Sequence, residues 1–162
     1  MASDVRVAAV DLADAAQAAA FLELLDHYAR DPMGGGNGLQ PAVRARLVPA
    51  LRDQSGFHGA LAWQGAAAVG LINCFAGFST FAAQPLLNVH DIVVHKAMRG
   101  RGIGQSLLAW AEARARELGC CKLTLEVLSK NERAMASYRR AGFVPYALDP
   151  AAGQALLLQK QL

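Results

Sequence analysis

The sequence predicts an α/β (α+β) fold, and three observations lead to this class. Apolar, β-prone segments alternate with segments whose apolar residues recur every three to four positions. The chain has 162 residues, of which 54% are hydrophobic and 18% charged, enough to bury one substantial core. There are no internal repeats or low-complexity segments. We therefore expect a single domain covering residues 1–162.

The first third of the chain is predicted to be mainly helical. A short strand at 5–10 precedes a helix that enters at 11–14, where acidic residues favour an N-terminus, and continues to about Arg30. Residues 31–38 contain many helix breakers and form a loop, and helical spacing returns from 39 to 54. Four glycines in that loop resemble a phosphate cradle. No strand precedes them and no Lys-Ser or Lys-Thr follows, which favours a mobile loop.

The middle of the chain is predicted to form most of the sheet. Residues 57–78 are apolar and β-prone, with Gln64-Gly65 placed to turn a hairpin. A strand at 86–94 follows, and its second half is apolar on both faces, as in a covered sheet. A helix from 102 to 118 and an alternating strand at 122–127 come next.

Roughly the last forty residues are predicted to form one helix and two strands. Ser129 and Glu132 form a capping-box pattern for a helix that ends at Gly142. Short strands are predicted at Val144–Leu148 and Ala155–Leu158.

Charge and cysteine content argue against several classes of protein. The formal net charge is +3, without a run of like charges, so we expect no nucleic-acid partner. The three cysteines have no zinc-site spacing, so we expect no metal and a reducing compartment. Residues 1–20 lack the uninterrupted apolar core of a signal peptide, and no apolar stretch approaches the ~20 residues of a membrane span. A cytoplasmic protein is predicted.

A glycine-rich loop at Arg99-Gly100-Arg101-Gly102-Ile103-Gly104 is the first functional signal. It lies between an apolar strand and an amphipathic helix, so unsatisfied N–H groups at the helix start would face an anion. Gln105 stands where a dinucleotide fingerprint needs its third glycine, and the Lys-Ser or Lys-Thr of a nucleotide triphosphate loop is missing. The loop therefore predicts an anion site without identifying the ligand.

Two motifs together resemble the GNAT superfamily of N-acyltransferases. The first is RxxGxG, and the second, on the helix after the fifth strand, is NxxAxxxYxxxGF. They occur in the order typical of the family, with one helix and one strand between them. The residues that carry them are Arg99, Gly102 and Gly104 for the first, and Asn131, Ala134, Tyr138, Gly142 and Phe143 for the second. The resemblance is firm from Val89 to Phe143 and weakest between Asp31 and Gly56.

This resemblance implies a fold and a cofactor. The fold is a central mixed, mostly antiparallel sheet of six to seven strands, with about four helices on both faces and a cofactor cleft where the fourth strand splays from the fifth. The cofactor is acetyl-CoA. The residues implied in binding it are Ile92, Val93, Val94, Arg99, Gly100, Arg101, Gly102, Ile103, Gly104, Gln105, Asn131, Ala134 and Tyr138.

The chemistry needs an acid for the departing thiolate and a route for the amine proton. A tyrosine, with an ordinary pKa near ~10, can protonate sulfur at neutral pH, so Tyr138 is the predicted general acid. His90 and Asp91 are consecutive on a strand and are expected to point to opposite faces, so at most one addresses the acceptor. Asp91, acting through water, is the preferred base. His90 as a structural residue and Glu126 as a third base candidate stay open.

The acceptor is predicted to be a primary amine of a small molecule or peptide. Carboxylates and aromatic rings suit a cationic amine, and the candidate substrate-binding residues are Asp26, Tyr28, Asp31, Phe78 and His90. An acetyl-CoA sensor without turnover and a protein lysine or N-terminal acetyltransferase are the alternatives. Acyl transfer through Cys74 is disfavoured, because no neighbouring base would activate it. A homodimer is possible, with Ala155–Leu158 as an edge strand.

Overall fold

The computed structural model describes residues 5–162, and their contacts divide the chain into two units. The first unit ends at Leu125, and the second runs from Glu126 to Leu162. The assignment of residues 1–162 to one domain stays a prediction.

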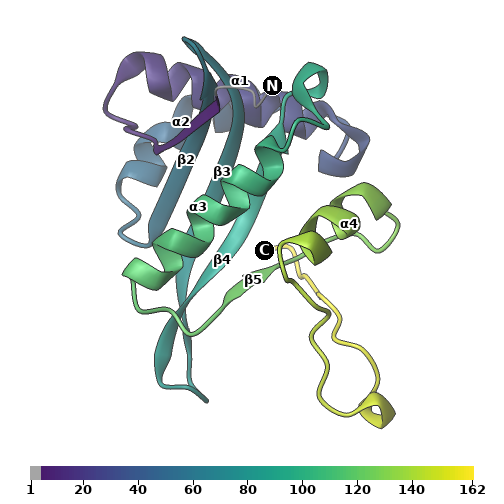
Figure 1. Cartoon of the computed structure of the whole chain (residues 1–162). Coiled ribbons are helices and arrows are strands. Elements are labelled where there is room, and N and C mark those ends of the chain that lie inside the picture. The colour runs from purple at the N-terminus through teal and green to yellow at the C-terminus, as the bar shows by residue number, and fades with distance from the viewer. Residues whose placement is uncertain (1–4) are drawn as a thin grey trace. The chain divides into compact units, whose positions relative to one another are not determined.

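A mixed sheet forms the centre of the first unit (Figure 1). Its strand order is β1-β2-β3-β4-β5; the first four strands pair antiparallel, and β5 pairs parallel to β4. The expected mixed, mostly antiparallel sheet is confirmed, but the expected count of six to seven strands is wrong, because the residues described form five. The strands are β1 (Val5–Ala9), β2 (Phe57–Gln64), β3 (Ala67–Ser79), β4 (Gln84–Val94) and β5 (Leu123–Leu125).

The predicted hairpin between β2 and β3 is present. Gly65, in the turn after Gln64, has a φ of 58°, a left-handed conformation that glycine adopts without steric cost. Beyond the turn, the residues of β3 from Val69 to Cys74 are all buried. A continuous buried run of this kind is typical of a strand covered on both faces.

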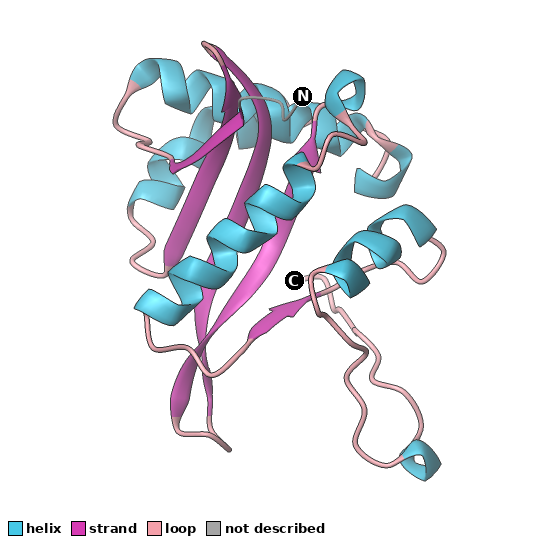
Figure 2. Cartoon of the chain, viewed as in Figure 1, coloured by secondary structure: helices cyan, strands magenta, loops and turns pink. Residues whose placement is uncertain are grey.

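Helices cover both faces of this sheet (Figure 2). In the first unit they are α1 (Ala15–Arg30), α2 (Pro41–Arg52) and α3 (Ile103–Glu117). Helix α1 begins where the side chain of Asp14 accepts a hydrogen bond from the Gln17 N–H (2.9 Å), as the acidic residues predicted. Helices α1 and α2 lie on one face and α3 lies on the other.

The core has one layer on each side of the sheet. On the α1 face, the fully buried Phe21 packs with Leu61, Leu71 and Val93 of the strands. Burial of such a ring contributes roughly 2–3 kcal/mol. On the opposite face α3 approaches the sheet closely at Gly70. A Cβ there would lie 3.1 Å from the carbonyl oxygen of Val93 and 3.2 Å from the Leu107 side chain.

The pairing between β4 and β5 is short. Leu123–Leu125 is paired with Leu87–Val89, whereas β4 continues to Val94. No other strand in the part of the chain that the structure describes pairs with the edge of β4 beyond Val89 on that side. The end of β4 that leads to the glycine-rich loop therefore has backbone groups outside any ladder on one edge.

The second unit contains helix α4 (Glu132–Arg140). The residue that caps it is Asn131, whose side chain accepts a hydrogen bond from the Ala134 N–H (3.2 Å), and not Ser129 as expected. The predicted stop at Gly142 is confirmed, since this residue has a φ of 89°.

The two C-terminal strands predicted at Val144–Leu148 and Ala155–Leu158 are absent from the described chain. A short helical turn at Pro150–Ala152 is the regular structure between them. β-propensity becomes a strand only when a neighbouring strand supplies a hydrogen-bond ladder, and these residues have none. The described chain by itself therefore has no strand at Ala155–Leu158, and pairing of this segment with a second copy stays a prediction.

Candidate functional site

The glycine-rich loop from Arg99 to Gly104 leads into α3 and contains its first residues. Gly100 and Gly102 have φ angles of 81° and 82°, and a Cβ on either would have nothing within 4 Å. Gly102 is the N-cap of α3 and supplies no side-chain cap. N–H groups of the first turn therefore meet an open approach, which is what an anion requires.

Arg99 fastens this loop to the body of the first unit. Its Nε donates to the carbonyl oxygen of Val94 (3.1 Å), and its Nη2 donates to Oδ2 of Asp31 (2.9 Å). Hydrogen bonds from the Met33 N–H and from Arg99 lower the pKa of Asp31. The structure thus brings together a predicted cofactor residue and a predicted acceptor residue, as an ion pair between the end of α1 and the loop.

The other predicted cofactor residues of this unit differ in exposure. Ile103 is 2% exposed and Val93 is 4% exposed, so their side chains belong to the core and only their backbone groups are available. Arg101 is exposed and Gln105 is half-buried. The half-buried positions beside them are Ile92, Val94 and Gly104.

A β-bulge in β4 changes the direction of the predicted catalytic side chains. Asn73 of β3 lies opposite Asp91, and the next residue, Cys74, lies opposite Val89, so His90 has no partner on β3. The His90 ring contacts Phe75 edge-on (5.5 Å between centroids), while Asp91 bonds Asn73. Phe75 and Asn73 are two residues apart on one strand and share a face.

His90 and Asp91 therefore point to the same face of the sheet. The expectation that they point to opposite faces is wrong, because the extra residue of a bulge interrupts the alternation of side chains. Both side chains can address one ligand on the α1 face.

Asp91, Asn73 and Tyr28 form a polar cluster on that face. The Nδ2 of Asn73 donates to Oδ2 of Asp91 (3.0 Å). Burial, followed by the charges of Asp91 and Asp31, raises the pKa of Tyr28. Sequence reasoning missed Asn73, although a lone amide between Ile72 and Cys74 in an apolar strand was a readable signal.

Two predicted acceptor residues have other surroundings. The carboxylate of Asp26 is buried and accepts hydrogen bonds from Arg30 Nε (2.8 Å) and from the Leu39 N–H (2.8 Å), which lower its pKa. It therefore ties α1 to the segment that precedes α2. Phe78 pairs with Pro85 near the turn of the β3–β4 hairpin, and the structure does not bring it to the Asp91 cluster.

A histidine pair joins α1 to the segment before the glycine-rich loop. The rings of His27 and His95 are stacked with centroids 4.5 Å apart, and Nε2 of His27 accepts from the Lys96 N–H (3.3 Å). Burial, followed by the cationic neighbours, lowers the pKa of His27. This contact and the Arg99–Asp31 ion pair both join the C-terminal end of α1 to the segment from His95 to Arg99.

The predicted residues of the second unit lie on α4. Asn131 caps the helix through its side-chain oxygen, and Ala134 donates to it. The ring of Tyr138 contacts that of Phe143 edge-on, with centroids 6.0 Å apart. Since positions 131, 134 and 138 recur at helical spacing, the motif residues line one side of α4.

Cys74 is buried and unsuited to nucleophilic catalysis. Burial and the nearby Asp91 raise the pKa of its thiol to about 12. A thiolate is therefore scarce at neutral pH, in agreement with the expectation that acyl transfer does not pass through this residue.

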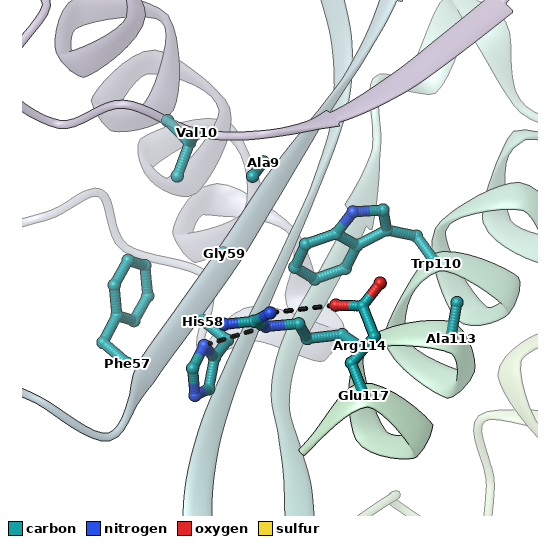
Figure 3. Close-up of a pocket in the computed structure, with 9 residues that line it drawn as sticks. All are labelled: Ala9, Val10, Phe57, His58, Gly59, Trp110, Ala113, Arg114 and Glu117. Carbon is teal, nitrogen blue, oxygen red and sulfur yellow. Dashed lines mark hydrogen bonds and ion pairs between the residues drawn. The ribbon is translucent and has the colours of Figure 1, made fainter.

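A shallow pocket of about 350 Å³ lies elsewhere on the first unit, at the C-terminal half of α3 (Figure 3). Arg114 donates to Nδ1 of His58 (3.3 Å) and pairs with Glu117 (2.9 Å). Its charge is compensated, and none of the predicted site residues lines the pocket. The lining residues are Ala9, Val10, Phe57, His58, Gly59, Trp110, Ala113, Arg114 and Glu117.

Among residues 5–162, none of the helices has the length and apolar character needed to cross a membrane.

Comparison with known proteins identifies similar chains. A family model described as the acetyltransferase (GNAT) family matches residues 20–143. Streptothricin acetyltransferase of Streptomyces lavendulae is 43% identical over 77 residues, which cover 48% of this chain and 41% of that protein. Aminoalkylphosphonate N-acetyltransferase of Salmonella typhimurium is 35% identical over 86 residues, covering 53% of this chain and 56% of that protein. The chain thus spans about half the length of these curated relatives.

Solved structures share the fold over nearly the whole chain. An aminoglycoside acetyltransferase from an uncultured soil metagenomic sample, solved in complex with sisomicin, superposes with a TM-score of 0.77. The match covers 98% of this chain and 96% of that one at 17% sequence identity.

Proposed function

Because this chain belongs to the GNAT family of acetyltransferases, we propose that it transfers an acetyl group from acetyl-CoA to a primary amine of a small molecule or peptide. The observation that carries the proposal is the loop from Arg99 to Gly104, which presents the uncapped start of α3 directly after β4. The proposed reaction is direct attack of the amine on the thioester in a ternary complex.

The loop residues fit a pyrophosphate. Gly100 and Gly102 leave open space where side chains would otherwise stand, and the first-turn N–H groups of α3 can donate to phosphate oxygens. Exposed Arg101 adds positive charge. Arg99 would act through the loop's conformation, since Asp31 and the Val94 carbonyl oxygen already take its guanidinium.

The backbone at the end of β4 is proposed to polarise the acetyl carbonyl. Ile92, Val93 and Val94 lie past the last residue that pairs with β5, so N–H groups on that edge are available. On α4, Ala134 is small enough to leave room for the pantetheine arm, and the side-chain N–H groups of Asn131 can donate to one of its amides. When bound, acetyl-CoA supplies the thioester that is broken.

The proton transfers are assigned to Tyr138 and Asp91. In the proposed step the amine nitrogen forms a bond to the acetyl carbon and the carbon–sulfur bond breaks. Asp91 takes the amine's proton through a water molecule, and the hydroxyl of Tyr138 gives a proton to the departing thiolate. His90, on the same face as Asp91, is the second candidate to contact the acceptor.

The acceptor is proposed to be a cationic amine that binds near Asp91, Tyr28 and His90. Asp31 and Asp26 contribute less than expected, since arginine side chains neutralise both carboxylates. One relative is named for an aminoalkylphosphonate, which supports a small-molecule amine here. The three free cysteines, Cys74, Cys120 and Cys121, support a reducing compartment, and we propose the cytoplasm.

Acetyl-CoA consumption tests the proposal. Thiol release is followed with a broad panel of amines, with the same mixture lacking any amine as the blank. Turnover of one or more cationic amines above the blank is expected. Saturable acetyl-CoA binding without thiol release for any amine would contradict an enzyme and support the sensor alternative.

A further inference from the structure

Asn73 is a buried polar residue with half of its side-chain amide unused. It is 3% exposed, and Asp26 is the only other buried polar or charged residue in the described chain. Asp26 is fully engaged by Arg30 and Leu39. In contrast, Oδ1 of Asn73 has no hydrogen-bond partner among residues 5–162. Buried polar atoms are rarely left unsatisfied, so this oxygen marks a place where a donor binds.

The orientation of the amide is fixed by its neighbour. Asp91 Oδ2 lies 3.0 Å from Nδ2 of Asn73, and an ionised carboxylate can only accept. The nitrogen must therefore face Asp91, which leaves the carbonyl oxygen of Asn73 as an acceptor. A flipped amide would set two acceptors against each other.

Asp91 is itself without a compensating cation. In the described part of the chain, the arginines near this face are paired elsewhere: Arg99 with Asp31, and Arg30 with Asp26. None of the ion pairs includes Asp91. A carboxylate and an unpartnered carbonyl oxygen thus lie side by side, with a protonated Tyr28 near them.

Resting on the proposed function, we propose that Asp91 and Oδ1 of Asn73 together bind the N–H groups of a primary ammonium ion. Asn73 is also a positioning residue, because its Nδ2 holds the Asp91 carboxylate in place. An ammonium carries three donors and a positive charge, so it satisfies both acceptors at once. The pair therefore selects amines that are cationic when they bind.

Two amine substrates of nearly equal shape test this selection. Propylamine is cationic at neutral pH, whereas ethoxyamine has a similar chain and is uncharged. The measured quantity is the ratio of their kcat/KM values. In Asn73→Leu the ratio of propylamine to ethoxyamine is expected to fall about tenfold, the effect of one charge-assisted hydrogen bond. The KM for acetyl-CoA should stay within a factor of about two.

If Asn73→Leu acts only through a loss of packing, kcat/KM falls equally for both amines and the ratio is unchanged. That result would overturn the proposal. Asn88→Leu is the matched control. It removes another amide on the same face, whose Nδ2 bonds Oγ1 of Thr124 (3.0 Å), and should leave the ratio unaltered. If Asn73→Leu does not fold, Asn73→Ala replaces it. That variant also removes the acceptor oxygen, so the ratio should fall in the same way, whereas an unchanged ratio would contradict the proposal.

Binding is measured separately from turnover. Propylammonium chloride is titrated into the isotope-labelled wild-type protein, and side-chain amide resonances are followed by NMR. A saturable shift of the Asn73 amide signal is expected, and absence of any shift there would overturn the proposal. If no amine is acetylated but the Asn73 shift is present, the proposed function fails while the ammonium site stands.

Discussion

At His90 one extra residue decides which side chains of β4 meet. Without the bulge, Asp91 would follow His90 onto the opposite face. With it, both lie on the α1 face with Asn73 and Phe75. A bulge needs no special residue in the strand that carries it, so the sequence around His90 gives no sign of one.

The proposed role of Tyr138 as general acid is tested by removing its hydroxyl group. Tyr138→Phe is expected to lower kcat by tenfold or more, because the thiolate would leave without a proton donor. The affinity for acetyl-CoA should be nearly unchanged, since the ring is kept. Steady-state kinetics and a CoA-binding titration measure both quantities.

Tyr146→Phe is the matched control for this prediction. It removes the same hydroxyl from another tyrosine of the second unit, one that is 63% exposed. Its kcat should equal that of the wild type. A Tyr138→Phe variant as active as this control would remove Tyr138 from the role of acid.

At the scale of elements, the start of α3 depends on the conformation of its glycines. Gly102→Val is expected to weaken CoA binding at least tenfold, for two reasons. A β-branched residue is strained at a φ of 82°, by roughly 1–2 kcal/mol, and its side chain would occupy the space where we propose that phosphate binds. Isothermal titration with CoA measures the dissociation constant.

Gly119→Val separates strain from binding in the same helix. Gly119 follows the C-terminal end of α3 with a φ of 68°, and a Cβ there also has nothing within 4 Å. The substitution should lower the melting temperature to a similar extent while CoA binding stays unchanged. Equal losses of CoA affinity in both variants would show that the loop holds no phosphate.

At the scale of the whole molecule, stability should fall as the pH drops below the ordinary histidine pKa. Burial is the first cause that lowers the pKa values of His27 and His58 below 6.5, and cationic neighbours add to it. Between pH 6.5 and the lowered pKa values of these two histidines, the unfolded chain binds more protons than the folded chain. Unfolding is therefore favoured as the pH falls through this window.

Thermal melts between about pH 7.5 and about pH 5.5 measure this dependence. In the His27→Gln variant the melting temperature should fall less steeply with falling pH, because one of the two histidines whose pKa is lowered has been removed. A second loss is expected below about pH 3.8, where Asp26 and Asp31, whose pKa values are lowered, become protonated. An unchanged slope in His27→Gln would show that this imidazole does not contribute.

A homodimer is the remaining prediction at this scale. The C-terminal segment Ala155–Leu158 has exposed leucines, with Leu156 at 79% and Leu158 at 84%. A strand formed only on pairing with a second copy would bury them. Light scattering should give twice the chain mass of 17.1 kDa, and Leu156→Ser with Leu158→Ser should shift it to the monomer. A monomeric wild type would contradict the prediction.

The sequence by itself determined the elements and the motifs, because both depend on local rules. Apolar periodicity placed α1, α3 and the β2–β3 hairpin, and glycine positions placed the turn at Gly65 and the stop at Gly142. The glycine-rich loop at the start of α3 was readable as well, since it needs only glycines at a helix start. Local patterns failed at the C-terminus, where apolar segments alone predicted strands that need a partner.

Only the tertiary structure decided which side chains meet. The Arg99–Asp31 ion pair joins residues 68 positions apart, and the Asn73–Asp91 bond joins two strands. Register and the bulge set the second contact, and the packing of α1 on the sheet sets the first. Such contacts depend on the free energy of the whole packed arrangement, so no pattern within either segment foretells them.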